Sequence, residues 1–103
     1  MSEIVEQIGL PALLEQLAEE CSELSQACLK YSRKLRGENP TPKTEQDCVV
    51  SLMEEVSDVR LCIAQLDLAG LYDYTFVLNT MGDKLLRWHE RLREAERDEE
   101  WKE

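Results

Sequence analysis

Residues 10–36 read LPALLEQLAEECSELSQACLKYSRKLR and decide the fold. Apolar side chains recur in this stretch at spacings of three and four residues, the pattern of an amphipathic helix. Gly37 and the following prolines end the pattern, because glycine favours a helix cap and proline cannot continue a helix. The sequence therefore predicts a long helix over residues 10–36. Its apolar stripe is Leu10, Leu14, Leu17, Cys21, Leu24, Cys28, Tyr31 and Leu35.

Two further stripes with the same spacing predict helices over residues 43–69 and 73–96. The first of them can start at Thr41 with Pro42, or at Thr44 with Asp47. Gly82 in the last helix indicates close backbone packing or a bend. Residues from about 97 onward are highly charged and are expected to fray. The two stripes are Val49, Leu52, Val56, Val59, Ile63 and Leu66, then Tyr74, Leu78, Met81, Leu85, Trp88 and Leu92.

The length of 103 residues corresponds to one small domain, residues 1–103. Three long helices with one apolar seam each cannot fill a four-sided bundle, whereas two copies of the chain can. We therefore expect an all-α fold whose three helices complete a four-helix-type bundle by homo-oligomerisation.

Charge and cysteine content exclude several classes of protein. The 12 Lys and Arg against 22 Asp and Glu give a net charge of −10, which disfavours binding to nucleic acid. Apolar runs fall short of the roughly 18 residues of a membrane helix, and the N-terminus lacks the basic region of a signal peptide. We expect a cytoplasmic protein with no membrane partner. The cysteines form no Cys-x-x-Cys motif and are predicted to be reduced core residues: Cys21, Cys28, Cys48 and Cys62.

Two acidic segments share one pattern, Glu-Glu-x-Ser-acid-apolar, at residues 19–24 and 54–59. Residues three apart on a helix lie about 60° from one another, so each segment carries a same-face carboxylate pair. Such like charges repel, and helix stability alone gives no reason for them. The pairs are Glu20 with Glu23, and Glu55 with Asp58.

A divalent cation explains the carboxylate pairs. Both pairs flank the same side of their apolar seams, where an antiparallel neighbour could bring them together. Oxygen-only ligands select hard cations, which favours Mg²⁺ or Mn²⁺. The alternative is a solvated face whose carboxylates form salt bridges with Lys30, Arg33 and Lys34.

The last predicted helix carries a basic strip beside its seam, made by Lys84, Arg87 and Arg91. These side chains could hold the phosphates of a nucleotide and stabilise charge on a leaving pyrophosphate. The alternative is a surface helix on which they pair with Glu90 and Glu94.

The order of these motifs resembles the MazG-like all-α nucleoside triphosphate pyrophosphohydrolases. It runs from Glu-Glu-x-x-Glu at residues 19–23, through Glu-x-x-Asp at 55–58, to Lys-Leu-x-Arg-x-x-x-Arg-Leu at 84–92. The resemblance implies a nucleotide-pool house-cleaning enzyme, a dimer or tetramer, that hydrolyses a (deoxy)nucleoside triphosphate to the monophosphate and pyrophosphate.

The resemblance also implies roles for individual residues. Glu20, Glu23, Glu55 and Asp58 would ligate Mg²⁺, while Glu19 or Glu54 would orient ligands or help to activate water. Two other functions stay open: a noncatalytic helical oligomerisation module whose acids only solubilise it, and a relative that binds nucleotides without cleaving them.

Overall fold

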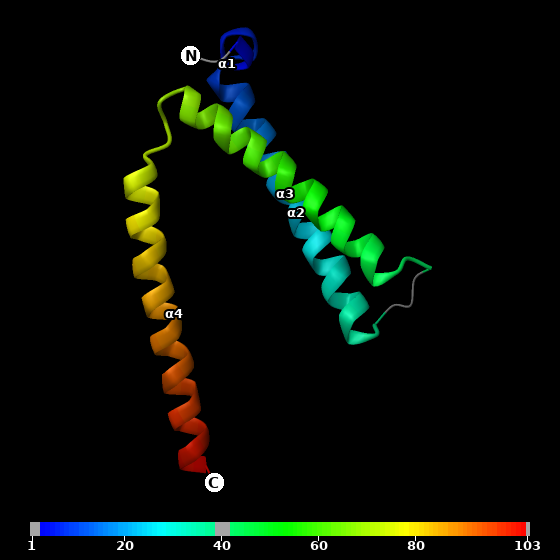
Figure 1. Cartoon of the computed structure of the whole chain (residues 1–103), viewed down its shortest axis with the longest axis vertical. Helices are drawn as coiled ribbons and strands as arrows, with labels where there is room; N and C mark the ends of the chain where they lie inside the picture. The colour runs from blue at the N-terminus through cyan, green and yellow to red at the C-terminus, as the bar shows by residue number, and fades with distance from the viewer. Residues whose placement is uncertain (1–2, 39–41, 103) are drawn as a thin grey trace. The chain divides into compact units, whose positions relative to one another are not determined.

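The structure is a computed structural model that describes residues 3–38 and 42–102, with side chains at 3–38 and 42–99 (Figure 1). These residues form four helices and no strand: α1 (Glu3–Ile8), α2 (Leu10–Arg36), α3 (Glu45–Leu68) and α4 (Tyr74–Lys102). The predicted all-α class is confirmed. The chain divides into two compact units, Met1–Tyr72 and Asp73–Glu103.

Helix α2 has the predicted bounds. It ends at Gly37, whose φ of 74° lies in the left-handed region that favours glycine. The Gly37 N–H donates to the Lys34 carbonyl at 3.2 Å and the Glu38 N–H donates to the Arg33 carbonyl at 3.0 Å. These two bonds form a Schellman motif, which satisfies carbonyls that the helix end would leave unpaired.

Helix α3 begins at the second of the two predicted starts. The Thr44 hydroxyl accepts from the Asp47 N–H at 3.1 Å, and the Asp47 carboxylate accepts from the Thr44 N–H at 3.0 Å. This reciprocal capping box fixes the first turn. The alternative start at Thr41 lies outside the described residues.

The short helix α1 was not predicted, because six residues are too few to show a helical period. It packs its Val5 side chain, 5 % exposed, beside the start of α2, where Leu13 is 2 % exposed. Gly9 joins the two helices with a φ of 85°, a conformation that other residues rarely adopt.

Helices α2 and α3 lie antiparallel and side by side (Figure 1). The predicted seam residues of α3 are half-buried, as are four of the eight on α2, namely Leu10, Leu17, Leu24 and Tyr31. Burial is deepest at Val5, Leu13, Cys48 and Cys62.

The prediction that all four cysteines are core residues is wrong for Cys21 and Cys28. All four thiols are free, but only Cys48 and Cys62 are buried. One neighbouring helix covers a narrow sector of α2, so the flanks of its apolar stripe stay open, including Leu14 and Leu35.

Asp73 caps the start of helix α4, because its side chain accepts from the Phe76 N–H at 3.0 Å. It continues to Lys102, past the expected end at 96 and through the segment expected to fray. Opposite charges three residues apart support these turns, as between Glu94 and Arg97. Its whole predicted stripe is exposed: Tyr74, Leu78, Met81, Leu85, Trp88 and Leu92.

Among the described helices, none has an apolar stretch of the length that a membrane crossing requires.

Candidate metal centre

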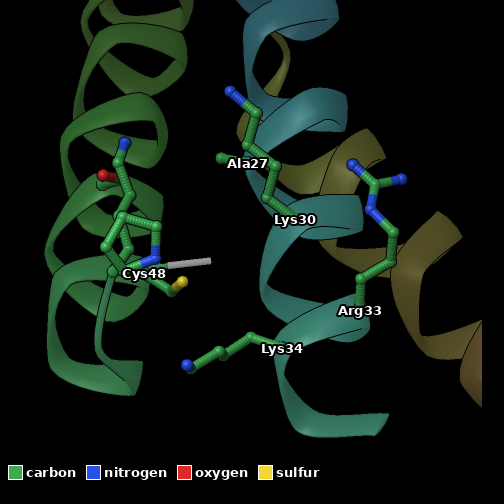
Figure 2. Close-up of a pocket in the computed structure, with 8 residues that line it drawn as sticks. Ala27, Lys30, Arg33, Lys34 and Cys48 are labelled. Carbon is green, nitrogen blue, oxygen red and sulfur yellow. The ribbon is translucent and has the colours of Figure 1, made fainter. Parts of the chain in front are cut away.

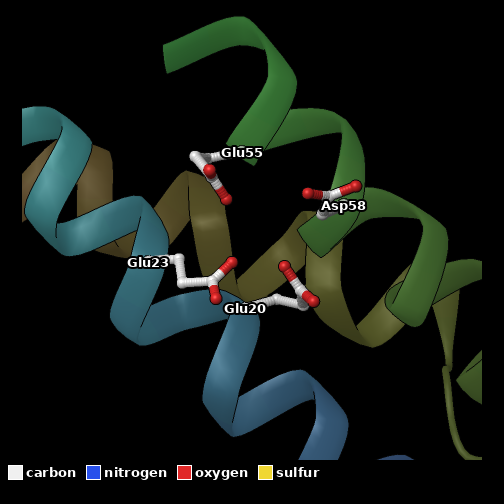
Figure 3. Close-up of side chains that lie close together, drawn as sticks. All are labelled: Glu20, Glu23, Glu55 and Asp58. Carbon is white, nitrogen blue, oxygen red and sulfur yellow. The ribbon is translucent and has the colours of Figure 1, made fainter. Parts of the chain in front are cut away.

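Four carboxylates converge where α2 and α3 pack together (Figure 3). Glu20 and Glu23 project from successive turns of α2, and Glu55 and Asp58 do the same on α3. One ligand oxygen from each residue lies within 4.8 Å of the other three. The spacing of three residues puts each pair on one helix face, and the antiparallel packing of the helices brings the two pairs together.

The cluster is electrostatically strained. Repulsion from Glu20, followed by desolvation and repulsion from Glu55, raises the pKa of the Glu23 carboxyl above its usual value. Glu20 and Glu55 are half-buried, whereas Glu23 and Asp58 are exposed. Four like charges are thus gathered at one point, where they repel one another.

Two buried carboxylate oxygens of the cluster have no hydrogen-bond partner among the described residues. Glu20 Oε2 and Glu55 Oε2 are both buried and unpaired, while Glu20 Oε1 accepts from Gln16 Nε2 at 2.7 Å. Leaving a buried acceptor unsatisfied costs on the order of 1–3 kcal/mol, and more when it is charged. A hard divalent cation such as Mg²⁺ or Mn²⁺ would satisfy both oxygens, so the residues present fit the ion that the sequence suggested.

The salt-bridge alternative is not observed in the described part of the chain. Within residues 3–38 and 42–99, no ion pair joins the four carboxylates to Lys30, Arg33 or Lys34.

A buried thiol lies next to the cluster. Burial, with smaller contributions from Glu20 and Asp58, raises the pKa of the Cys62 thiol above its usual value. Cys62 follows Asp58 by one helical turn, as Gln16 precedes Glu20 by one turn. Cys62 was predicted as a core residue, but neither it nor Gln16 was connected with the carboxylates, although a spacing of four residues from a site acid places each of them beside one.

Glu19 and Glu54, which the resemblance makes candidates for water activation, do not join the four-carboxylate cluster. Both side chains are exposed. Each precedes a cluster residue by one position, and a step of one residue turns the helix by about 100°. Glu19 does act on the cluster at a distance, because its charge contributes slightly to the raised pKa of Glu23.

Lys84, Arg87 and Arg91, predicted to bind the substrate, are exposed on α4. They belong to the second unit of the chain, whereas the acidic cluster belongs to the first.

A groove that sequence analysis missed borders the cluster. One hollow of about 350 Å³ is lined by Glu23 and Glu55 from the cluster and by Gln26, Ala27, Lys30, Lys43 and Ser51. A second hollow of about 390 Å³ is lined by Ala27, Lys30, Arg33, Lys34, Pro42, Lys43, Cys48 and Ser51 (Figure 2). No short motif connects Lys30 with Lys43, so only the packing of the helices could reveal that they line one groove.

Comparison of the chain with protein-family models, curated proteins and solved structures finds no significant match.

Proposed function

We propose that this chain is a Mg²⁺-dependent nucleoside triphosphate pyrophosphohydrolase of the MazG-like all-α type, acting on the cytoplasmic nucleotide pool. The observation that carries the proposal is the convergence of Glu20, Glu23, Glu55 and Asp58 within 4.8 Å. The unpaired buried oxygens of Glu20 and Glu55 strengthen it, because a cation would satisfy both.

In the proposed reaction, the oxygen of a water molecule forms a bond to the α-phosphorus of the triphosphate. The bond from the α-phosphorus to the oxygen that bridges to the β-phosphorus breaks, and pyrophosphate leaves with that oxygen. The water loses a proton, and the products are the monophosphate and pyrophosphate. When bound, the cation polarises the phosphate and lowers the pKa of the attacking water.

The chain's own residues have separate roles in this scheme. Glu20, Glu23, Glu55 and Asp58 hold the cation. Glu19 and Glu54 are exposed carboxylates that directly precede the cluster residues Glu20 and Glu55 in the sequence. One of the two orients the attacking water or accepts its proton. Lys84, Arg87 and Arg91 are proposed to bind phosphate from α4.

We further propose that the working enzyme is a homodimer or homotetramer. The support is the exposed apolar stripe of α4, where Tyr74 is 66 % and Trp88 60 % exposed. Large contiguous apolar surfaces mark sites of association, and helices with one open seam pair to complete a bundle.

The test is release of pyrophosphate from a panel of canonical and modified triphosphates with Mg²⁺, with Mn²⁺ and without metal. We expect turnover only with metal, and loss of turnover in Glu55→Gln while the far-ultraviolet circular dichroism is unchanged. The matched control is Glu15→Gln, which removes one exposed carboxylate of α2 away from the cluster. Full turnover by Glu55→Gln would overturn the proposal.

The exposed stripe of α4 also favours a second function, a noncatalytic helical module that joins protein chains. Thermal melts separate the two functions, because Mg²⁺ with a triphosphate stabilises only a protein that binds them. Stabilisation without product would identify a nucleotide-binding relative that lacks turnover.

A further inference from the structure

The two hollows beside the acidic cluster adjoin each other, because four residues line both. They share Ala27, Lys30, Lys43 and Ser51 in their linings, and the smaller one also includes Glu23. Lys30 and Lys43 therefore line the same hollow as Glu23 and Glu55 of the cluster. We call these two hollows together the cationic groove.

The cationic groove concentrates positive charge in an acidic protein. Lys30 and Lys43 line both hollows, and the larger hollow adds Arg33 and Lys34 without any carboxylate. The whole chain has a net charge of −10, so this grouping runs against its composition. In the described part of the chain, no ion pair of Lys30 or Lys43 with a carboxylate is found.

Helix electrostatics explain only part of this charge. Arg33 and Lys34 lie in the last turn of α2, where cations stabilise the negative end of the helix dipole. Lys43 directly precedes the N-cap Thr44, at the positive end of α3, where a cation is unfavourable. It contributes only the smallest of the effects on the pKa of Asp47. No local interaction of Lys43 therefore offsets the unfavourable placement of its charge at the start of α3.

We propose that the cationic groove binds the pyrophosphate end of the substrate and so fixes its direction across the acidic cluster. This inference rests on the proposed function. Ammonium and guanidinium groups are strong partners of phosphate oxygens, and a groove of this volume is in the usual range of about 300–1,000 Å³ for small-ligand sites. The nucleoside then points away from Lys30 and Lys43, past the opposite side of the cluster.

The direction has a chemical consequence. The β- and γ-phosphates carry the negative charge that develops when pyrophosphate leaves, and the groove offers fixed positive charge at that place. The groove also has an apolar part, formed by Ala27, Pro42 and Cys48. Because the groove holds phosphates in this arrangement, it does not read the base.

The test measures binding of pyrophosphate and of a nucleoside monophosphate by isothermal titration calorimetry, in Mg²⁺, to the full chain. We expect Lys30→Gln and Lys43→Gln each to weaken pyrophosphate binding about tenfold, the loss of about 1.4 kcal/mol expected for a charged hydrogen bond, and to leave monophosphate binding unchanged. The matched control is Arg60→Gln, which removes an exposed cation of α3 outside the groove and is expected to bind both ligands as the wild type does.

Two results would overturn the inference. One is pyrophosphate binding by Lys30→Gln and Lys43→Gln equal to that of Arg60→Gln. The other is that the two lysine variants lose monophosphate and pyrophosphate affinity equally. That result would place the α-phosphate in the groove and reverse the direction of the substrate across the cluster. Both lysines are exposed, and unchanged circular dichroism melts establish that the variants fold.

Failure of the inference can be distinguished from failure of the proposed function. Binding of Mn²⁺ to the acidic cluster, measured by electron paramagnetic resonance, and pyrophosphate release are followed in the same variants. If the wild type hydrolyses triphosphates and the lysine variants keep its KM and its inhibition by pyrophosphate, the groove assignment fails and the enzyme assignment stands. If the wild type binds pyrophosphate through Lys30 and Lys43 but cleaves no triphosphate, the enzyme assignment fails and the groove stands as an anion site.

Discussion

Glu20 on α2 and Glu55 on α3 lie in one four-carboxylate cluster, each with its Oε2 atom buried and without a hydrogen-bond partner. Unpaired buried carboxylate oxygens are costly, and here two of them belong to one cluster of carboxylates. A cation bound between the two carboxylates would offset this cost. The relationship between these two residues is therefore the strongest argument for a cation at this site.

Cation binding is expected to stabilise the protein. A ligand that binds only the folded state at 100 times its dissociation constant contributes about 2.7 kcal/mol. We expect Mg²⁺ or Mn²⁺ to raise the melting temperature of the wild type and EDTA to reverse the effect. Glu20→Gln should abolish the response, whereas Glu15→Gln should retain it. A wild-type melting temperature that is the same with metal and with EDTA would contradict the site.

Glu23→Gln is expected to stabilise the metal-free protein. The folded state raises the pKa of Glu23, so the folded state binds this proton more tightly than the unfolded state. Its contribution to stability therefore falls as the pH rises from the ordinary glutamate value through the raised one. In urea unfolding with EDTA between pH 4 and 8, the free energy of unfolding should fall less with rising pH in Glu23→Gln than in the wild type. Added metal should stabilise the variant less than the wild type. A variant less stable than the wild type in EDTA at neutral pH would show that repulsion does not dominate at Glu23.

The capping box at the start of α3 gives the free energy of unfolding a pH dependence opposite to that of Glu23. Hydrogen bonds with Thr44 lower the pKa of Asp47, so the stability that Asp47 contributes is present above its ordinary pKa and is lost as the pH falls through the lowered value. Thr44→Ala should cost about 1 kcal/mol of unfolding free energy, the usual value for a lost N-cap. Asp47→Asn should lack this part of the acid destabilisation. The comparison is urea unfolding at pH 7 and at pH 3, and parallel curves for wild type and Asp47→Asn would contradict it.

The cysteines are expected to react in two classes. Cys21 and Cys28 are exposed and Cys48 and Cys62 are buried, and the raised pKa of Cys62 further reduces its thiolate fraction. Alkylation followed by peptide mass spectrometry should label Cys21 and Cys28 first, and the other two only in urea. Protection of Cys21 and Cys28 that disappears on dilution would show that a second chain covers this side of α2.

Gly82 gives a test of the α4 surface. A Cβ atom placed on Gly82 meets nothing within 4 Å, and its backbone is helical, so neither space nor φ within the chain requires glycine. Gly82→Ala should therefore stabilise the helix by roughly 0.5–1 kcal/mol, measured by thermal melting of the full chain. A lower melting temperature would instead indicate that another copy of the chain packs closely against Gly82.

The local features of the fold could be predicted because short-range interactions determine them. The end of α2 at Gly37 follows from one glycine that can adopt a positive φ, and the start of α3 from the hydroxyl of Thr44 and the carboxylate of Asp47. The spacing of three residues between Glu20 and Glu23 places both on one helix face in any environment. The short α1 and the extension of α4 to Lys102 were missed, because neither adds an apolar period.

Only the tertiary structure decided which groups meet across the helices. The sequence determined by itself that two same-face carboxylate pairs exist, because helical geometry repeats every 3.6 residues. The packing of α2 against α3 decided that the pairs share one point, that Glu19 and Glu54 stay outside it, and that Lys30 and Lys43 line one groove beside it. The physical reason is that the rotation and register of two packed helices depend on all the side chains at their contact, and no single motif encodes them.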